Sequence, residues 1–351
     1  MPPQKEPTKL WASFLLWLKM KRLIIATALA ALMASPSYGQ NTKAKPQQTL
    51  LLYPQGQEVD MGIVENGAAV TLGPGESNCI EGEEGCDEWG SLNQITAPRI
   101  KLYFPKKGNG QMVVCCPGGG YTHVSSWNEG AYVAEWMVGQ GIAVCVVEYR
   151  LPNKHWSVPL TDVQNAFRYC RAHAEQWGID QIGVIGFSAG GHLAACASNL
   201  YVDEITRPDF SVLVYPVILM EEGLTHKGTH DHLIGKASEW ADKTLSVNEY
   251  EAKVAKYNDL MERYSLDKQV SENTPPTFLV HCSDDGTVPI ENSLTYFEAL
   301  RANNVPTEFQ IYPTGGHGWG FTTSQFGSDR LEPWRSTFFK ALSDWLEKVH
   351  E

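Results

Sequence analysis

Basic residues are scarce in this sequence. Its 351 residues include 28 lysines and arginines against 40 aspartates and glutamates, which gives a formal charge of −12 at pH 7. Because nucleic acids and anionic membranes bind basic surfaces, this balance argues against either as a partner. The sequence also lacks low-complexity tracts and repeats of fixed period, which excludes solenoids and propellers in their usual form.

Long hydrophobic runs are missing as well. Two apolar runs lie within the first forty residues, but neither reaches the ~20 residues that a membrane-spanning helix needs. The second run, Leu23–Met33, follows two basic residues and precedes a segment of small residues that ends at Gly39. This order predicts a signal peptide over Met20–Gly39, with residues 1–19 as an upstream extension. We expect a secreted or periplasmic protein without stable membrane insertion after cleavage; an uncleaved membrane anchor is the alternative.

The eight cysteines follow neither the spacing of a metal site nor that of a dense disulfide framework. Half of them lie in or beside apolar, strand-like runs, where cysteine behaves as a small hydrophobic residue. These are Cys115, Cys116, Cys145 and Cys282. Cys79 and Cys86 instead flank a polar loop. In an exported protein this pair is expected either to form a local disulfide or to remain as two free thiols.

Strand-like and helix-like segments alternate from residue 98 to the end. This alternation predicts the α/β class, with a mostly parallel sheet covered by helices on both faces and a ligand site at the carboxyl ends of the strands. Strands are expected at 99–104, 112–116, 142–147, 182–187, 210–215, 277–282 and 308–312, and helices at 131–138, 159–177, 189–200, 291–303 and 331–350. The polar segment 219–272 is predicted to be a helical cap insertion in this domain (98–351), and residues 40–97 an N-terminal extension with edge strands.

A nucleophile motif lies where one of these strands meets the next helix. The segment Gly186–Gly190 fits the pattern G-x-S-x-G, with Ser188 at its centre. A sharp strand-to-helix turn exposes such a serine at the top of a sheet, and glycines on either side keep the turn free of side chains. We therefore predict that Ser188 is a catalytic nucleophile.

Candidates for the base and the acid follow the last two strands. Asp284 and Asp285 come directly after the strand at 277–282, and His317 lies in a glycine-rich loop after the strand at 308–312. The order serine, acid, histidine is that of hydrolases with this elbow. We predict His317 as the base, whereas chemistry alone does not separate the two aspartates. We expect His192 and His281 to be structural residues that pack in the fold. We expect the same of His226, His230 and His232, for which a metal site is the alternative.

A run of three glycines follows the strand at 112–116. Backbone amides that point at a developing oxyanion stabilise the transition state of acyl transfer. We expect one such donor to be the amide of Ala189, directly after the nucleophile, and the other to come from Gly119 or Gly120. Aromatic residues close to the expected rim, Tyr121, Trp127 and Trp319, are candidates for substrate contacts, with packing as the equal alternative.

Together these motifs resemble the bacterial acetylesterase and acetyl xylan esterase-like branch of the alpha/beta hydrolases. The segments that carry the resemblance are Cys116–Tyr121, Glu148–Arg150, Gly186–Ala194 and Asp285–Pro289. The resemblance covers about residues 98–349 and implies that Asp285, three residues before Val288, is the acid. The sequence departs from the related hormone-sensitive-lipase type at Pro117, where that type has a histidine, so the glycine loop must be braced differently.

The resemblance implies a serine carboxylesterase that removes acyl groups, most often acetyl and also feruloyl, from plant polysaccharides or oligosaccharides. Such an enzyme works through an acyl-enzyme and needs neither a metal nor an organic cofactor. General short-chain esterase activity is a further alternative within this class. Two rivals outside it are a prolyl-type serine peptidase and a non-catalytic carbohydrate-binding protein on the same scaffold.

Overall fold

The computed structural model describes residues 46–52, 59–65, 68–72, 91–93, 95, 98–242, 244–321 and 329–351. The predicted signal peptide, Met20–Gly39, lies outside these residues, as do Cys79 and Cys86. In the part of the chain that is described, no helix combines the length and the hydropathy needed to cross a membrane.

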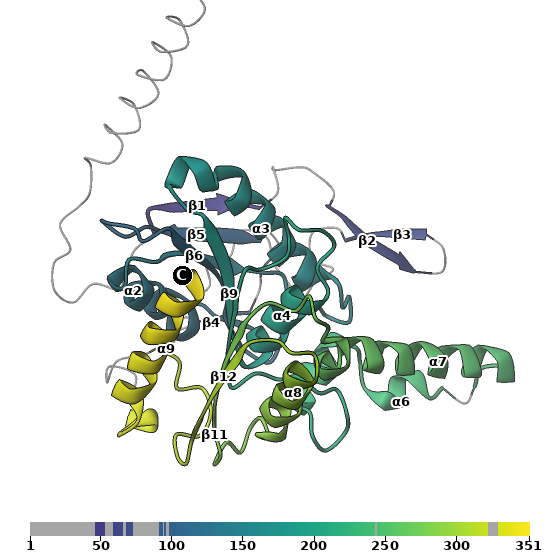
Figure 1. Ribbon diagram of the computed structural model, residues 1–351. Helices are drawn as coiled ribbons and strands as arrows, with labels where there is room; N and C mark the ends of the chain where they lie inside the picture. Colours follow the sequence, from purple (N-terminus) through teal and green to yellow (C-terminus); the bar gives the residue numbers. More distant parts are fainter. Residues whose placement is uncertain are drawn as a thin grey trace, which may run out of the picture. The chain divides into compact units, whose positions relative to one another are not determined.

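The core of the protein is an eight-stranded sheet with the order β1-β5-β8-β6-β9-β10-β11-β12 (Figure 1). Its strands are β1 (Gln48–Leu51), β5 (Arg99–Tyr103), β6 (Gln111–Cys116), β8 (Ala143–Glu148), β9 (Gln181–Phe187), β10 (Ser211–Val214), β11 (Thr277–Cys282) and β12 (Thr307–Tyr312). From β8 to β12 every neighbouring pair is parallel, whereas β1 and β5 are antiparallel additions at one edge. Strands β6, β8 and β11 are buried along their whole length, as a parallel sheet covered on both faces requires.

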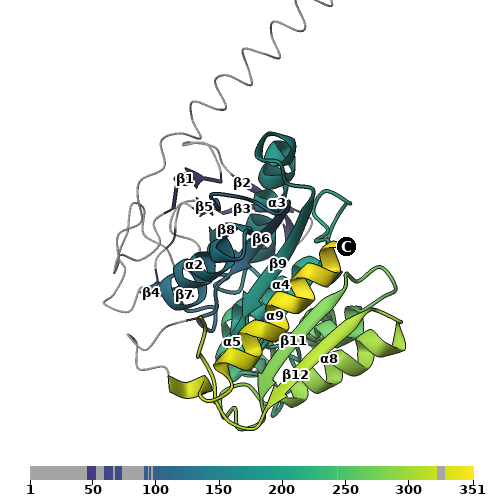
Figure 2. The ribbon, with the colours of Figure 1, turned by 60° about the vertical axis from the view of Figure 1, so that its left-hand side comes forward.

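Helices cover both faces of this sheet (Figure 2). Helices α2 (Tyr132–Gly139) and α9 (Arg335–His350) contribute to one hydrophobic cluster, and α3 (Val158–Trp177), α4 (Ser188–Asn199) and α8 (Glu291–Ala302) contribute to the other. The sequence expectation of a doubly covered, mostly parallel sheet is thus confirmed. Helix α9 begins four residues later than expected, because Pro333 interrupts the run; a short 3₁₀ turn, η4 (Asp329–Leu331), precedes it.

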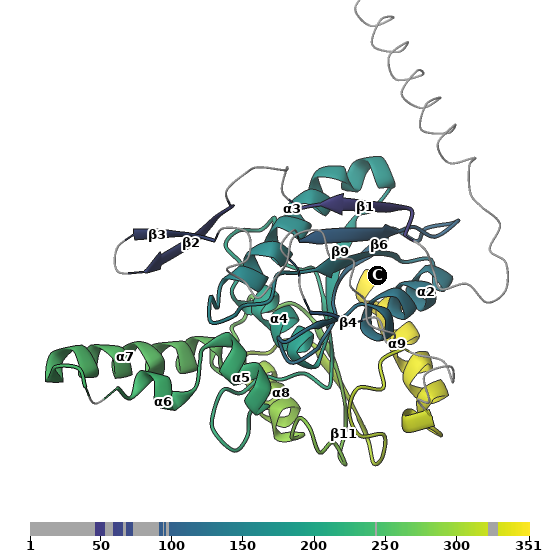
Figure 3. The same ribbon diagram turned by 180° about the vertical axis from the view of Figure 1, so that it is seen from behind.

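Residues 219–272 contain the helices α5 (Lys227–Leu233), α6 (Ala237–Trp240), α7 (Val247–Tyr264) and the 3₁₀ turn η2 (Leu266–Gln269). Helix α7 starts at a capping box, in which Ser246 and Glu249 exchange side-chain and backbone hydrogen bonds. Its first turns extend away from the sheet, as Figure 3 shows from behind. Two small antiparallel pairs lie outside the main sheet: β2 (Val59–Glu65) with β3 (Ala68–Leu72), and β4 (Ser91–Leu92) with β7 (Val124–Ser125).

Candidate active site

Ser188 lies at the junction of β9 and α4, in a backbone conformation that residues other than glycine rarely adopt. Its φ angle is +54°, in the left-handed region. The turn is tight enough that a Cβ atom on Gly186 would lie 2.2 Å from the carbonyl oxygen of Gly190, and one on Gly190 would lie 2.1 Å from that of Cys116. Glycine is therefore required on both sides of the serine, as the G-x-S-x-G pattern indicates.

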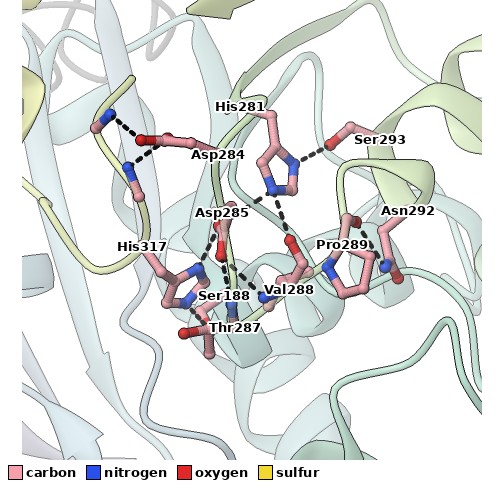
Figure 4. Close-up of polar contacts among 12 residues, drawn as sticks. Ser188, His281, Asp284, Asp285, Thr287, Val288, Pro289, Asn292, Ser293 and His317 are labelled. Carbon is pink, nitrogen blue, oxygen red and sulfur yellow. Dashed lines mark hydrogen bonds and ion pairs between the residues drawn. The ribbon is translucent and has the colours of Figure 1, made fainter. Parts of the chain in front are cut away.

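His317 and Asp285 meet Ser188 at the carboxyl end of the sheet (Figure 4). The Nε2 atom of His317 lies 2.8 Å from Oγ of Ser188, and its Nδ1 atom lies 2.7 Å from Oδ2 of Asp285. Strands β11 and β12 are parallel neighbours, so the loops that follow them emerge side by side. The structure thus brings together the three side chains that the sequence singled out, although they are up to 129 positions apart.

Asp285 is surrounded by hydrogen-bond donors. The backbone amides of Thr287 and Val288 donate to its Oδ1, each over 2.9 Å, and His281 faces its Oδ2 opposite His317. Burial raises the pKa of the Asp285 carboxyl, but the hydrogen bonds from His281 and His317 outweigh it and hold that pKa well below its usual range. An ionised Asp285 orients the imidazole with Nδ1–H toward the carboxylate, which leaves Nε2 free to accept the Ser188 proton.

The neighbouring Asp284 points the other way. Its carboxylate accepts from the backbone amides of Gly316, over 2.8 Å, and Gly315, over 3.3 Å. It therefore shapes the loop that carries His317 without a hydrogen bond to the imidazole.

The glycine loop after β6 leaves two amides available. The amide of Gly118 donates to Oε2 of Glu129 over 2.7 Å. Within the described ranges, no group accepts a hydrogen bond from the amides of Gly119 or Gly120. The amide of Ala189 belongs to the first turn of α4, where backbone donors have no intrahelical partner. These three amides, named from the sequence, remain the candidate donors to an oxyanion.

The brace that replaces the missing histidine comes from two residues that the sequence analysis did not assign. The hydroxyl of Tyr149 donates to the carbonyl of Pro117 over 2.6 Å, and the Glu129 carboxylate binds the Gly118 amide. Tyr149 lies in one of the segments that carry the resemblance, which was the available signal. Glu129 gives no such signal, since its burial depends on how the chain folds around it.

Two of the proposed substrate contacts are core residues. Tyr121 is 1% exposed and Trp319 is fully buried. The ring of Trp319 packs edge-on against Tyr215, with 4.9 Å between centroids, and the Tyr121 hydroxyl meets Nδ1 of His192 at 3.0 Å. Neither side chain offers a face to a sugar, so the packing alternative applies to both. Trp127 is half-buried and packs against the same hydrophobic cluster as α2 and α9.

Three other histidines singled out from the sequence have structural partners. His192 lies beneath the elbow, where Nε2 meets the carbonyl of Tyr264 at 2.9 Å, and burial lowers its pKa to about 4. His230 and His232 contact Tyr257 and the Gly228 carbonyl respectively. In the described part of the chain, no three histidine, cysteine or acidic residues are grouped as a metal site would need.

His226 connects the cap segment to the glycine loop. Its side chain accepts a hydrogen bond from the backbone amide of Thr229 and so caps α5. A Cβ atom on Gly120 would lie 3.3 Å from Cε1 of His226, which places this ring beside the candidate oxyanion loop. Burial and the neighbouring His317 lower the pKa of His226.

Among known proteins, this chain is similar to several esterases and to a xylanase. The chain is 35% identical over 265 residues to an acetylxylan esterase of Xylanibacter ruminicola, covering 74% of this chain and 50% of the relative. It is 31% identical over 230 residues to an endo-1,4-beta-xylanase B of Butyrivibrio fibrisolvens, covering 60% and 33%. The chain thus spans at most half the length of these two relatives.

Solved structures agree with this picture. An acetyl ester-xyloside bifunctional hydrolase from Caldicellulosiruptor lactoaceticus is 34% identical, with a TM-score of 0.59, over 72% of this chain and 89% of that one. A sugar hydrolase from Lactococcus lactis is 28% identical, with a TM-score of 0.57, over 74% and 97%. The fold is that of the alpha/beta hydrolases. Residues 100–300 match the BD-FAE family, and the chain belongs to that family.

Proposed function

We propose that this protein is a serine carboxylesterase that removes acetyl groups from plant polysaccharides or their oligosaccharides. The observation that carries the proposal is the linear arrangement of Ser188, His317 and Asp285, with contacts of 2.8 and 2.7 Å, beside uncommitted backbone amides. Acyl transfer needs such an arrangement, because a serine hydroxyl is a weak nucleophile until an adjacent base removes its proton.

In the proposed reaction, the Ser188 oxygen attacks the ester carbonyl while His317 accepts the hydroxyl proton. The tetrahedral oxyanion is held by the amides of Ala189 and the glycine loop, and each donor of this kind stabilises it by about 3 kcal/mol. The imidazolium then protonates the departing sugar oxygen, which leaves an acyl-enzyme. Water, deprotonated by His317, attacks this ester and releases the acid together with free Ser188.

The substrate class rests on the relatives. An acetylxylan esterase and an acetyl ester-xyloside hydrolase are similar to this chain over about three-quarters of its length. Feruloyl esters and simple short-chain esters are the alternatives within the same chemistry. We also propose that the protein acts outside the cytoplasm, on the basis of the signal-like segment Met20–Gly39.

Acid release from native polysaccharides tests this function. Purified protein and a Ser188→Ala variant are incubated with acetylated xylan, feruloylated arabinoxylan and acetylated pectin, and released acetate and ferulate are quantified. We expect acetate release from xylan by the wild type only. A proline-containing peptide nitroanilide tests the peptidase alternative, and fluorophosphonate labelling tests for a reactive serine. Absence of labelling in the wild type would contradict a catalytic role and favour a binding protein.

A further inference from the structure

A buried carboxylate joins the two loops on either side of Ser188. Glu129 belongs to a π-helical turn, η1 (Trp127–Ala131), and is 4% exposed. Its Oε2 accepts from the Gly118 amide over 2.7 Å, and its Oε1 accepts from the Tyr215 hydroxyl over 2.7 Å. A Cβ atom on Gly118 would lie 2.7 Å from Oε2 of Glu129 and 3.0 Å from Cβ of Ser188, so the carboxylate and the nucleophile residue both adjoin Gly118.

The other end of this connection is the loop that carries His317. The Tyr215 oxygen accepts a hydrogen bond from the Gly320 amide over 2.9 Å, and the Tyr215 ring lies 4.6 Å from the His317 ring, centroid to centroid. A parallel link comes from Asn128, whose side-chain amide donates to the carbonyl of Gly318 over 3.0 Å. The π-helical turn therefore holds the oxyanion loop and the histidine loop in one hydrogen-bonded unit.

The donors around Glu129 indicate its charge. The Gly118 amide can only donate, and the Tyr215 hydroxyl, whose oxygen already accepts from Gly320, directs its proton at the carboxylate. Burial raises the pKa of Glu129 above its ordinary value, and the Tyr215 hydrogen bond, the nearby His317 and the Gly118 amide offset part of this rise. The Glu129 carboxylate thus accepts from the Gly118 amide and the Tyr215 hydroxyl, and Tyr215 in turn packs against His317, which becomes a cation during catalysis. This arrangement favours an ionised Glu129.

We propose that Glu129 is a positioning residue of the active site, which holds the Gly118 amide and the Tyr215 hydroxyl and whose negative charge stabilises the imidazolium form of His317. This inference rests on the proposed acyl transfer. Because Glu129 occupies the Gly118 amide, the amides of Gly119 and Gly120 are left for the oxyanion. Because the carboxylate is hydrogen-bonded to Tyr215, whose ring packs against His317, its charge favours the step in which the imidazole takes the Ser188 proton.

Other groups also act on the two ends of this unit. Around Glu129 the titratable groups are Tyr215, Tyr149 and the Cys115 thiol, which donates to the Glu129 carbonyl over 3.1 Å. Around His317 they are Asp285, His226 and Arg330, whose guanidinium donates to the His317 carbonyl over 2.9 Å. Glu129 differs from these groups because it contacts the glycine loop directly and the histidine loop through Tyr215.

Three variants test the proposal. Glu129→Gln keeps the shape and one acceptor but removes the charge, and Tyr215→Phe removes the hydroxyl while keeping the carboxylate. Glu135→Gln is the matched control, since Glu135 is an exposed acid on α2. The readouts are the pH dependence of fluorophosphonate labelling, which requires Ser188 and His317 but no ester substrate, and kcat and KM for nitrophenyl acetate. Thermal unfolding shows that each variant is folded.

We expect Glu129→Gln to lower kcat and the labelling rate by roughly 10- to 100-fold with KM within about twofold, as for a misplaced oxyanion group. The acidic limb of the labelling profile should move to lower pH by about half a unit, because the imidazolium loses a neighbouring anion. Tyr215→Phe should lower the rate with a smaller shift of this limb, and Glu135→Gln should change neither.

An unshifted acidic limb in Glu129→Gln would overturn the electrostatic role, whatever the loss of rate. A labelling rate within twofold of the wild type would overturn the positioning role as well. If Glu129→Gln does not fold, an unchanged labelling rate and an unchanged acidic limb in Tyr215→Phe would overturn the proposal. Failure of the proposed function would instead appear in the wild type, as labelling at Ser188 without release of acid from any ester.

Discussion

The Nε2 atom of His281 lies 3.2 Å from Oδ2 of Asp285, on the side opposite His317. His281 is fully buried, and its Nδ1 meets the Ser293 hydroxyl at 2.8 Å. Because both partners of Nε2, the Asp285 carboxylate and the Val288 carbonyl, are acceptors, Nε2 carries the proton and donates to them. Asp285 is therefore held at Oδ2 by the two histidines and at Oδ1 by the backbone amides of Thr287 and Val288. This arrangement fixes the direction in which the acid presents its charge to the base.

The two adjacent aspartates should respond very differently to the same substitution. Asp285→Asn replaces the ionised acceptor of His317 with an amide that disfavours the productive tautomer, and we expect kcat to fall by about 10⁴, the loss seen on the corresponding change in a serine protease triad. Asp284→Asn keeps one of the two oxygens that accept from the Gly315 and Gly316 amides, and we expect less than about a tenfold loss. Steady-state kinetics on nitrophenyl acetate measure both. Equal losses would contradict this assignment of the acid.

The first glycine of the oxyanion loop should not tolerate a methyl group. A Cβ atom on Gly118 would lie 2.5 Å from the carbonyl oxygen of Phe187 as well as close to Glu129 and Ser188. We expect Gly118→Ala to lower kcat by about 10²-fold or more and stability by about 1–3 kcal/mol, through displacement of the loop. Gly139→Ala, at the end of α2 with nothing within 4 Å, should leave kcat unchanged.

Kinetics and urea unfolding of both glycine variants provide the measurement. Because Gly139→Ala only reduces the freedom of the unfolded chain, we expect it to be neutral or to stabilise by up to about 1 kcal/mol. An active Gly118→Ala variant would mean that the loop can shift without loss of its amides.

The parts of this structure that depend on contiguous sequence were predictable. The strand expected at 182–187 is β9, Gln181–Phe187, because a buried parallel strand is a continuous apolar run between turn residues. Chain order and loop positions also indicated which serine, histidine and acidic loop would meet. These features need only local patterns and the rule that parallel strands end at the same edge.

Features that depend on where a loop turns were not predictable. Asp284 and Asp285 occupy one turn, and their chemistry alone did not separate them, because the turn decides which side chain faces His317; the family resemblance is what implied Asp285. Trp319 is two residues beyond His317, yet it points into the core because positive-φ glycines at 318 and 320 turn the chain around it. The burial of Glu129 results from contacts with residues 11 and 86 positions away, which no periodicity reveals.

The Tyr149 hydroxyl should support the oxyanion loop through the Pro117 carbonyl. Tyr149→Phe removes this 2.6 Å hydrogen bond and leaves the carbonyl unsatisfied, for which we expect a loss of about 1–3 kcal/mol in stability and a lower kcat. Tyr312→Phe is a matched control, because in the described part of the chain the buried Tyr312 hydroxyl has no hydrogen-bond partner. Urea unfolding of the two variants should separate them, and equal losses would argue against the brace.

His192 should make the fold sensitive to mild acid. Nε2–H donates to the Tyr264 carbonyl and Nδ1 accepts from the Tyr121 hydroxyl, so the buried ring is neutral, with its pKa lowered to about 4 by burial. Between its ordinary pKa near 6.5 and about 4, the unfolded chain binds a proton that the folded protein does not. Stability must therefore fall as pH falls through this window, by about 3 kcal/mol from this group.

A His192→Gln variant tests this dependence, since the amide can donate to Tyr264 and accept from Tyr121 without titrating. Its free energy of unfolding should change less between pH 7 and pH 4.5 than that of the wild type, by about 1.4 kcal/mol per pH unit within the window. Comparison at pH 8, where both side chains are neutral, isolates any loss of packing. The lowered pKa of Asp285 acts on stability only below the ordinary carboxyl range, near pH 4 and lower, so it does not contribute to the difference. Parallel stability curves for the two proteins would show that the buried imidazole accepts a proton without cost, contrary to its two hydrogen bonds.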